Sequence, residues 1–126
     1  MRDDTDQQVV FVCQHGAFRS RIAAAYFNAA ATAGWSAISA GVTPQTEVSP
    51  RLGPLMAGTG VEEHIDASPP RSLGDRAAAR VIAIDVNVAG AETWRIGNAA
   101  TDEELREEIR KRVERLVAEV EERPAL

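Results

Sequence analysis

The stretch Val9-Val10-Phe11-Val12-Cys13-Gln14-His15-Gly16-Ala17-Phe18-Arg19-Ser20 decides the fold of this chain. Its first four residues are β-branched or aromatic and form an unbroken apolar run, which is typical of a central strand covered on both faces. A tight loop follows, and we expect Ser20 to cap the helix behind it. A buried strand, a loop and a helix in this order predict an α/β protein with a parallel sheet.

The composition is that of one folded domain. Of the 126 residues, 44% are hydrophobic and 26% are charged, so the chain can build one core. We expect a flexible tail at 1–7 and a single domain at 8–126. The formal net charge of -5 argues against a nucleic-acid partner, which would require a basic face. Neither a signal peptide nor a run of ~20 apolar residues is present, so we expect a cytoplasmic protein without a membrane partner.

Cys13 is the only cysteine of the chain. One cysteine cannot form an intramolecular disulfide or a cysteine-based zinc site. The two histidines, His15 and His64, do not have the spacing of metal ligands, so we predict no metal site. A free thiol at the end of the first strand is the expected outcome. The sequence does not predict an oligomeric state.

The rest of the chain alternates between strand and helix patterns. The first helix is expected to end near residue 33, and strands are predicted at 35–40, 80–86 and 93–96. A helix is predicted to start at Ser49-Pro50 and to stop near Gly58 or Gly60. Residues 61–72 are expected to be irregular, with a helical turn at 72–78. This alternation predicts a single-domain, three-layer αβα fold with a four-stranded parallel sheet.

The last helix carries the strongest periodic signal. Thr101 and Glu104 form a capping box at its start. One apolar stripe is expected to face the core, and it consists of Leu105, Ile109, Val113, Leu116, Val117 and Val120. On the solvent side, ion pairs are predicted between Glu107 and Lys111 and between Glu108 and Arg112.

The loop after the first strand has the parts of an oxyanion site. Ligands of open parallel sheets bind beyond the carboxyl ends of the strands, where Cys13 is placed. Loop amides from Gln14 to Arg19 can turn inward, and the helix N-terminus adds partial positive charge. Arg19 offers a planar fork to two oxygens, and Ser20 can donate a hydrogen bond to the sulfur. Thiolate attack on a phosphoryl group would give a cysteinyl-phosphate that water hydrolyses, and arsenate chemistry would use the same parts.

The alternative is that Cys13 is a small buried hydrophobe and Arg19 a surface cation, because free cysteines are commonly buried. The arginine six positions on, the serine after it and the strand-loop-helix context together favour the oxyanion site.

The sequence resembles the low-molecular-weight protein tyrosine phosphatases and the arsenate reductases that share their fold. These proteins carry Cys-x5-Arg-Ser/Thr directly after the first strand, as Cys13, Arg19 and Ser20 do here. The likeness extends along nearly the whole chain, through Ala40-Gly41-Val42, Ser49-Pro50, Gly60-Val61, residues 66–73, Val81 to Asp85, Trp94 and the final helix.

The resemblance implies a role for each residue of the loop. Cys13 would be the nucleophile, Arg19 the phosphate clamp and Ser20 the activator of the thiol. The intervening residues Gln14, His15, Gly16, Ala17 and Phe18 would bind the substrate oxyanion. The resemblance also implies that no cofactor is needed.

Two departures from the family pattern stand out. The family has glycine and asparagine two and three residues after the cysteine, where this chain has His15 and Gly16. Gly16 can still take a positive φ angle, but it has no side chain to brace the loop.

The family also places an Asp-Pro pair before the last helix, with the aspartate as general acid. This chain has Asn98-Ala99 there, and an amide cannot protonate a leaving group. The candidate replacements are Asp85, Asp102 and His15. Asp102 also fits a structural role in the first helical turn, Asp85 can serve to orient the loop, and His15 fits an exposed loop position equally well.

The leading hypothesis is therefore hydrolysis of a phosphate monoester through Cys13. One alternative is a single-cysteine arsenate reductase that needs an external thiol, because the two further cysteines of a thioredoxin-coupled relay are missing. The other is a non-catalytic oxyanion-binding module that lacks the general acid. The expected partners are a phosphate or arsenate-type oxyanion and a phosphorylated substrate.

Overall fold

The computed structural model describes residues 7–31, 34–73, 80–97 and 101–121. Its centre is a four-stranded parallel sheet in the order β2-β1-β3-β4. The strands are β1 (Gln8–Cys13), β2 (Ser36–Gly41), β3 (Arg80–Ile84) and β4 (Glu92–Trp94). The predicted α/β class and four-stranded parallel sheet are confirmed.

The strand order places a topological switch point beside the candidate loop. β1 lies at the centre, pairing with β2 from Gln8↔Ser36 to Cys13↔Gly41. On its other side, β1 pairs with β3 up to Val12↔Ala83. The chain thus leaves β1 for one side of the sheet and later returns to the other. Ligands of such sheets bind where the order reverses, at the carboxyl ends that carry Cys13 and Asp85.

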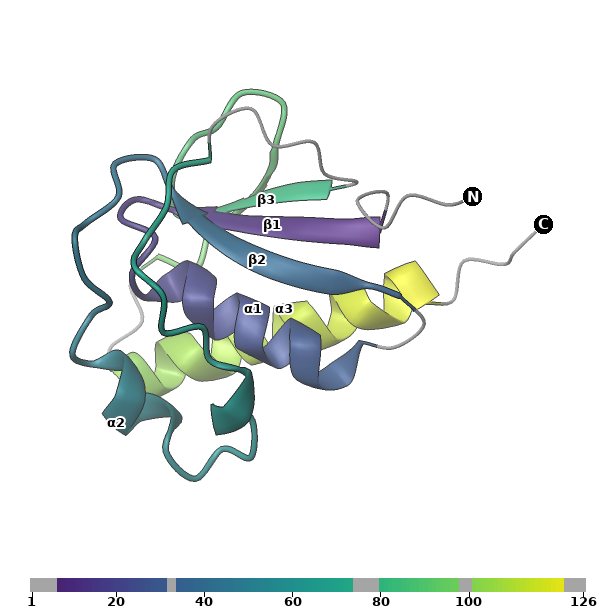
Figure 1. Cartoon of the computed structure of the whole chain (residues 1–126). Helices are drawn as coiled ribbons and strands as arrows, with labels where there is room; N and C mark the ends of the chain where they lie inside the picture. The colour runs from purple at the N-terminus through teal and green to yellow at the C-terminus, as the bar shows by residue number, and fades with distance from the viewer. Residues whose placement is uncertain (1–6, 32–33, 74–79, 98–100, 122–126) are drawn as a thin grey trace.

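One face of the sheet is covered by the described helices. Helices α1 (Arg19–Ala30) and α3 (Asp102–Glu121) lie side by side along it, and the short α2 (Leu52–Met56) packs at their end (Figure 1). Phe11, Ile82 and Ile84 from the sheet meet the predicted apolar stripe of α3, all of which is buried. A 3-10 helix, η2 (Glu62–His64), interrupts the segment predicted to be irregular.

The opposite face has a smaller apolar cluster. Val10, Val12 and Ala40 are buried there, and Leu73 and Val88 are among the partly buried side chains that pack on them. The helical turn predicted at 72–78 falls mostly on residues 74–79, outside the described part of the chain. Ser72 itself forms an isolated parallel bridge with Gly41.

Several predicted element boundaries were wrong. Helix α1 begins at Arg19, and the capping position belongs to Phe18, which makes no side-chain capping bond. The predicted cap, Ser20, lies inside the first turn because its hydroxyl faces Cys13. The helix ends at Ala30 rather than near residue 33. Strand β4 spans Glu92–Trp94 instead of 93–96.

Helix α3 begins at Asp102, directly after the predicted capping residue Thr101. The Thr101 hydroxyl accepts a hydrogen bond from the Glu104 amide at 3.1 Å, as a capping box requires. Glu108 pairs with Arg112 at 3.0 Å as predicted. The predicted Glu107–Lys111 pair was wrong, because the Glu107 carboxylate instead pairs with the guanidinium groups of Arg106 and Arg110. Among the described residues, no helix is long and apolar enough to cross a membrane.

Candidate active site

The loop from Cys13 to Ser20 is held by its carbonyl groups. Those of Cys13, Gln14, His15 and Ala17 accept hydrogen bonds of 3.0, 2.8, 3.1 and 3.1 Å from the amides of Val42, Thr43, Gln45 and Ser49. Amide and carbonyl groups of one peptide point in opposite directions, so the loop amides turn to the other side. No acceptor for the amides of residues 14–20 is found among the described residues. Successive unpaired amides of this kind form an anion-binding nest.

Two glycines let the loop approach the end of β2. Gly16 has φ +65°, a conformation that glycine adopts without steric cost. A Cβ atom on Gly16 would lie 2.8 Å from the Gly41 nitrogen, and one on Gly41 would lie 2.5 Å from the His15 carbonyl carbon. Neither position has room for a side chain. The backbone of the loop therefore rests directly on the backbone of β2.

Cys13 and Ser20 meet at the base of the loop. Their Sγ and Oγ atoms are 3.3 Å apart, and both residues are buried, with exposed fractions of 5% and 0%. In the neutral thiol the S–H donates to the serine oxygen. Once the proton leaves, the serine hydroxyl can donate to the sulfur and stabilise the thiolate.

Arg19 is oriented by a carboxylate at the end of β3. Its Nε lies 3.2 Å from Oδ2 of Asp85. The other oxygen of Asp85 accepts the amides of Ile96 and Gly97 at 2.8 and 3.0 Å. Asp85 has φ +56°, in the left-handed region that is uncommon for residues other than glycine. Asp85 thus contacts both Arg19 and the segment that precedes residue 98.

These side chains open into one cavity of about 240 Å³. Its lining consists of Cys13, Gln14, His15, Ala17, Phe18, Arg19, Gln45, Ser49, Arg51, Ile84 and Asp85. Phe18 is the only aromatic residue of that described lining, and the Arg51 guanidinium lies 4.3 Å from the centre of its ring. The walls therefore offer hydrogen-bonding groups and positive charge, with little surface for stacking a substrate ring.

The candidate general acids have different surroundings. Asp85 lines the cavity, but both of its oxygens face cationic or amide groups. His15 also lines it and is exposed. Asp102 does not line it and instead pairs with Arg51 at 3.3 Å. Asn98 and Ala99 lie outside the described residues.

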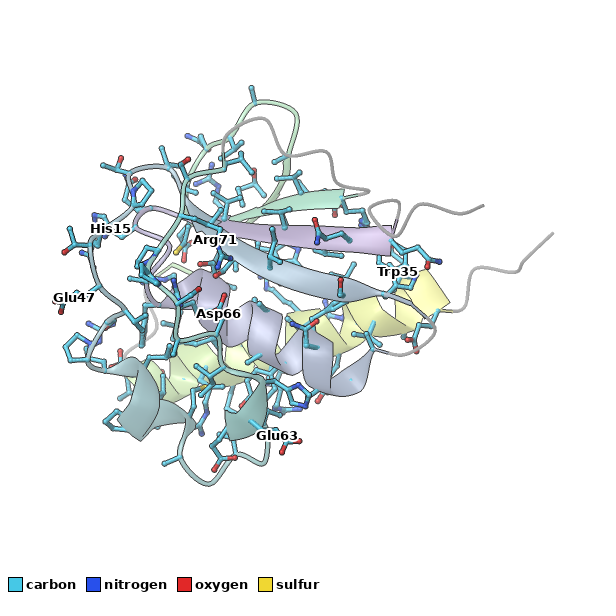
Figure 2. All side chains as sticks on the ribbon, in the orientation of Figure 1. His15, Trp35, Glu47, Glu63, Asp66 and Arg71 are labelled. Atoms are coloured by element: carbon cyan, nitrogen blue, oxygen red, sulfur yellow. The ribbon has the colours of Figure 1, made fainter. Side chains whose placement is uncertain are left out.

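A buried polar cluster on the other side of the loop was not predicted from the sequence. Arg21 is 1% exposed, and its Nε donates to the Gly16 carbonyl at 2.8 Å. Its Nη1 donates to the carbonyl of Asp66, whose carboxylate pairs with Arg71 at 3.1 Å. Figure 2 shows Asp66 and Arg71 next to each other near the end of β2. The available signal was an arginine between Ser20 and Ile22, at the start of an alanine-rich helix.

Charge and burial oppose each other in this cluster. Burial lowers the pKa of Arg21 from its ordinary value, and the charges of Asp66 and Cys13 act in the opposite direction. For Asp66, burial acts to raise the pKa, but hydrogen bonds from Ser68 and Arg71 together outweigh it and lower the pKa.

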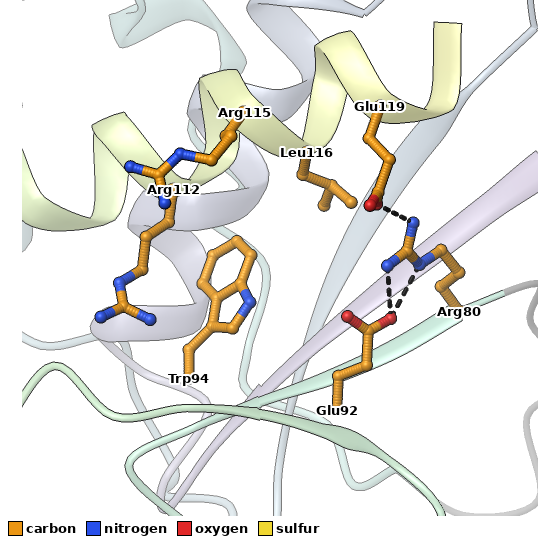
Figure 3. A pocket seen from close by; sticks show the side chains of 7 residues that line it. All are labelled: Arg80, Glu92, Trp94, Arg112, Arg115, Leu116 and Glu119. Carbon is orange, nitrogen blue, oxygen red and sulfur yellow. Dashed lines mark hydrogen bonds and ion pairs between the residues drawn. The ribbon is translucent and has the colours of Figure 1, made fainter. Parts of the chain in front are cut away.

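A second hollow lies between the edge strand β4 and helix α3. Figure 3 shows Trp94 at its centre, with Arg80 held between Glu92 and Glu119. The cavity measures about 160 Å³ and lies away from Cys13.

No protein-family model matches the chain, and no curated protein matches it. Solved structures do. An arsenate reductase from Archaeoglobus fulgidus is 30% identical, with a TM-score of 0.67, and the match covers 87% of this chain and 98% of that protein. A thioredoxin-dependent arsenate reductase from Corynebacterium glutamicum is 29% identical, with a TM-score of 0.73 over 90% of this chain. The chain spans 61% of the length of that protein.

A low-molecular-weight protein tyrosine phosphatase from T. tengcongensis has the same fold. It is 20% identical, with a TM-score of 0.69, and the match covers 90% of this chain and 99% of that one. The loop, the sheet order and these similarities agree with one another. The chain belongs to the superfamily of low-molecular-weight protein tyrosine phosphatases and arsenate reductases.

Proposed function

We propose that this protein hydrolyses a phosphate monoester through a cysteinyl-phosphate on Cys13. The Cys13 thiolate attacks phosphorus, an S–P bond forms, and the P–O bond to the leaving group breaks. The leaving group departs with the electron pair of that bond, as an anion that then takes a proton from water. Water then attacks the same phosphorus, the S–P bond breaks, and inorganic phosphate and the free thiolate are released.

The arrangement around the sulfur supports this chemistry. Ser20 Oγ lies 3.3 Å from Cys13 Sγ and would donate to the thiolate, and the loop amides without an acceptor among the described residues would bind the phosphoryl oxygens. With Asp85 on its Nε side, Arg19 has its two terminal nitrogens available as a fork for two more oxygens. The loop residues Gln14, His15, Gly16, Ala17 and Phe18 would thus serve as the oxyanion cradle.

The observation that carries hydrolysis over reduction is the cysteine count. A phosphatase cycle is closed by water, so Cys13 is sufficient by itself. Reduction of arsenate needs two electrons, which this chain cannot supply through a disulfide of its own because it has one cysteine.

Arsenate reduction is the second candidate, favoured by the 29–30% identity to two arsenate reductases and by the scarcity of aromatic walls. Here the Cys13 sulfur would displace water from arsenate and form an S–As bond. An external thiol would then attack the Cys13 sulfur, giving a mixed disulfide and arsenite. A second thiol would restore the cysteine. The two electrons come from the two external thiols.

The leaving-group proton sets a limit on the substrate. Asp85 is engaged with Arg19 and two backbone amides, so we assign it a positioning role rather than that of general acid. Without an acid, esters whose leaving group departs as an anion should react fastest. An absent acid typically costs ~10²–10⁴-fold in rate with poor leaving groups.

The test is rapid-mixing kinetics with p-nitrophenyl phosphate, whose leaving group needs no proton. We expect hydrolysis that Cys13→Ser lowers by about 10⁴-fold or more, while inorganic phosphate still binds to the variant. Phosphate binding without hydrolysis would instead support the non-catalytic oxyanion module. Arsenite production from arsenate and glutathione or mycothiol, without phosphatase activity, would replace the proposal with the reductase.

A further inference from the structure

Arg21 joins the candidate loop to a distant segment of the chain. It is the third residue of α1, next to Ser20, yet its side chain turns under the loop and is 1% exposed. Two of its nitrogens donate to backbone carbonyls, Nε to Gly16 and Nη1 to Asp66. The guanidinium therefore fixes the Gly16 peptide in relation to a point 45 residues further along.

In the described part of the chain, the Gly16 carbonyl receives its hydrogen bond from Arg21. The carbonyls of Cys13, Gln14, His15 and Ala17 are held by amides of residues 42–49, but the Gly16 carbonyl is held by Arg21. Gly16 itself has no side chain that could hold its peptide in place. Losing the Arg21 bond would leave the Gly16 carbonyl without the side-chain hydrogen bond that orients it.

Among the described residues, the charge of Arg21 is not fully matched. Arg21, Asp66 and Arg71 form a cluster of two cations and one anion there, so one positive charge of this described cluster is in excess. On the cavity side, Arg19 is paired with Asp85. Within the described part of the chain, the ionisable groups around Cys13 from the surrounding elements are His15, Arg19, Arg21, Arg51, Asp66, Arg71 and Asp85.

A buried charge without a full partner is unfavourable, and an apolar side chain of similar volume is usually the more stable choice. An arginine at this position is therefore expected only if a nearby anion compensates its positive charge. The Cys13 sulfur is such a group when ionised, because its charge and that of Arg21 attract each other.

We propose that Arg21 is a positioning residue of the oxyanion site. It holds the Gly16 peptide so that the loop amides converge on the ligand, and it balances the Cys13 thiolate from beneath the loop. The inference rests on the proposed function only in assigning an oxyanion to this loop. Gly16 has no side chain that could hold its own peptide, and the hydrogen bond from Arg21 serves this purpose instead.

The experiment compares Arg21→Met, which keeps the bulk of the side chain, with Arg21→Lys, which keeps the charge. The control is Arg106→Met, because Arg106 also donates to a backbone carbonyl, that of Leu55 at 2.8 Å, but lies away from the loop. The readouts are the affinity for inorganic phosphate, measured by calorimetry, and the rate of iodoacetamide alkylation of Cys13 as a function of pH. Circular dichroism establishes that each variant is folded.

We expect Arg21→Met to bind phosphate about 10- to 100-fold more weakly, as the loss of a charged hydrogen bond implies. Its alkylation at pH 7 should be about tenfold slower, because the thiolate loses an opposing charge. Arg21→Lys should keep alkylation close to the wild type but bind phosphate about threefold to tenfold more weakly, because a single ammonium cannot reproduce the two-carbonyl geometry. Arg106→Met should match the wild type in both measurements.

Wild-type phosphate affinity and alkylation in a folded Arg21→Met variant would overturn the inference. If that variant does not fold, Arg21→Lys decides, and wild-type phosphate affinity in it has the same consequence. Neither readout requires turnover. A protein that lacks phosphatase activity but shows the expected variant pattern would refute the proposed function and retain the role of Arg21.

Discussion

The two arginine-lined hollows of this protein differ in how their charges and hydrogen bonds are matched. Beside Trp94, Arg80 lies 2.6 Å from Glu92 and 2.5 Å from Glu119, so its charge is neutralised within the protein. Around Cys13, Arg19 is met by Asp85, but the described residues provide no acceptor for the amides of residues 14–20. The proposed oxyanion site is therefore distinguished from the other hollow by its unpaired loop amides, and not by its arginines.

Among the arginine variants of these two hollows, the largest effect should come from Arg19→Lys. A lysine replaces the planar fork with a point charge, so kcat/KM for p-nitrophenyl phosphate should fall by about 10²–10³-fold. Arg80→Lys is the matched control and should leave this value unchanged. Equal losses from both substitutions would show that the two hollows do not differ as their charges suggest.

Asp85→Asn separates positioning from acid catalysis. The amide keeps an oxygen for Ile96 and Gly97 but no longer pairs with Arg19 as an anion. We expect kcat/KM to fall by about tenfold with both p-nitrophenyl phosphate and phenyl phosphate, as the loss of one charged contact implies. A loss confined to phenyl phosphate, whose leaving group needs a proton, would make Asp85 the general acid instead.

Arg80→Met tests the hollow beside Trp94, where the charges are paired within the protein. Its ion pairs lie at the surface, with Glu92 and Glu119 side chains 47% and 60% exposed. Their loss should lower the free energy of unfolding by about 1 kcal/mol or less, with no change in phosphate affinity. Urea denaturation and calorimetry give the two values. Weaker phosphate binding in this variant would place an anion site beside Trp94.

The smallest effect should be a dependence of stability on pH at Asp66. Its folded-state pKa is lowered, so the stabilisation is complete above the unfolded value of about 3.9. It is lost as the pH falls through the lower folded value. Because the side chain is 38% exposed, we expect about 1 kcal/mol or less. The stability difference between wild type and Asp66→Asn should therefore shrink below pH 4. A difference that stays constant down to pH 2 would contradict the lowered pKa.

The sequence predicted the sheet and the cavity side of the loop because both depend on local patterns. The apolar run before Cys13, the periodicity of α3 and the spacing from Cys13 to Arg19 can each be seen within one segment. Ser20 was assigned two roles, and only its placement next to the sulfur holds. A helix N-terminus and a nearby serine do not by themselves distinguish a cap from a first-turn residue.

The underside of the loop could not be predicted because its contacts join distant segments. Arg21 meets Asp66 across 45 residues, and no periodicity links them. The same holds for Arg51, which reaches Phe18 from the start of α2. Fold-level pairing must be known before such partners can be named.

The contact between Gly16 and Gly41 also bears on how this loop can evolve. Each residue occupies the space that a side chain on the other would need. An asparagine at residue 16 would therefore require the end of β2 to move as well. As long as both glycines are kept, the loop has to be braced by other residues.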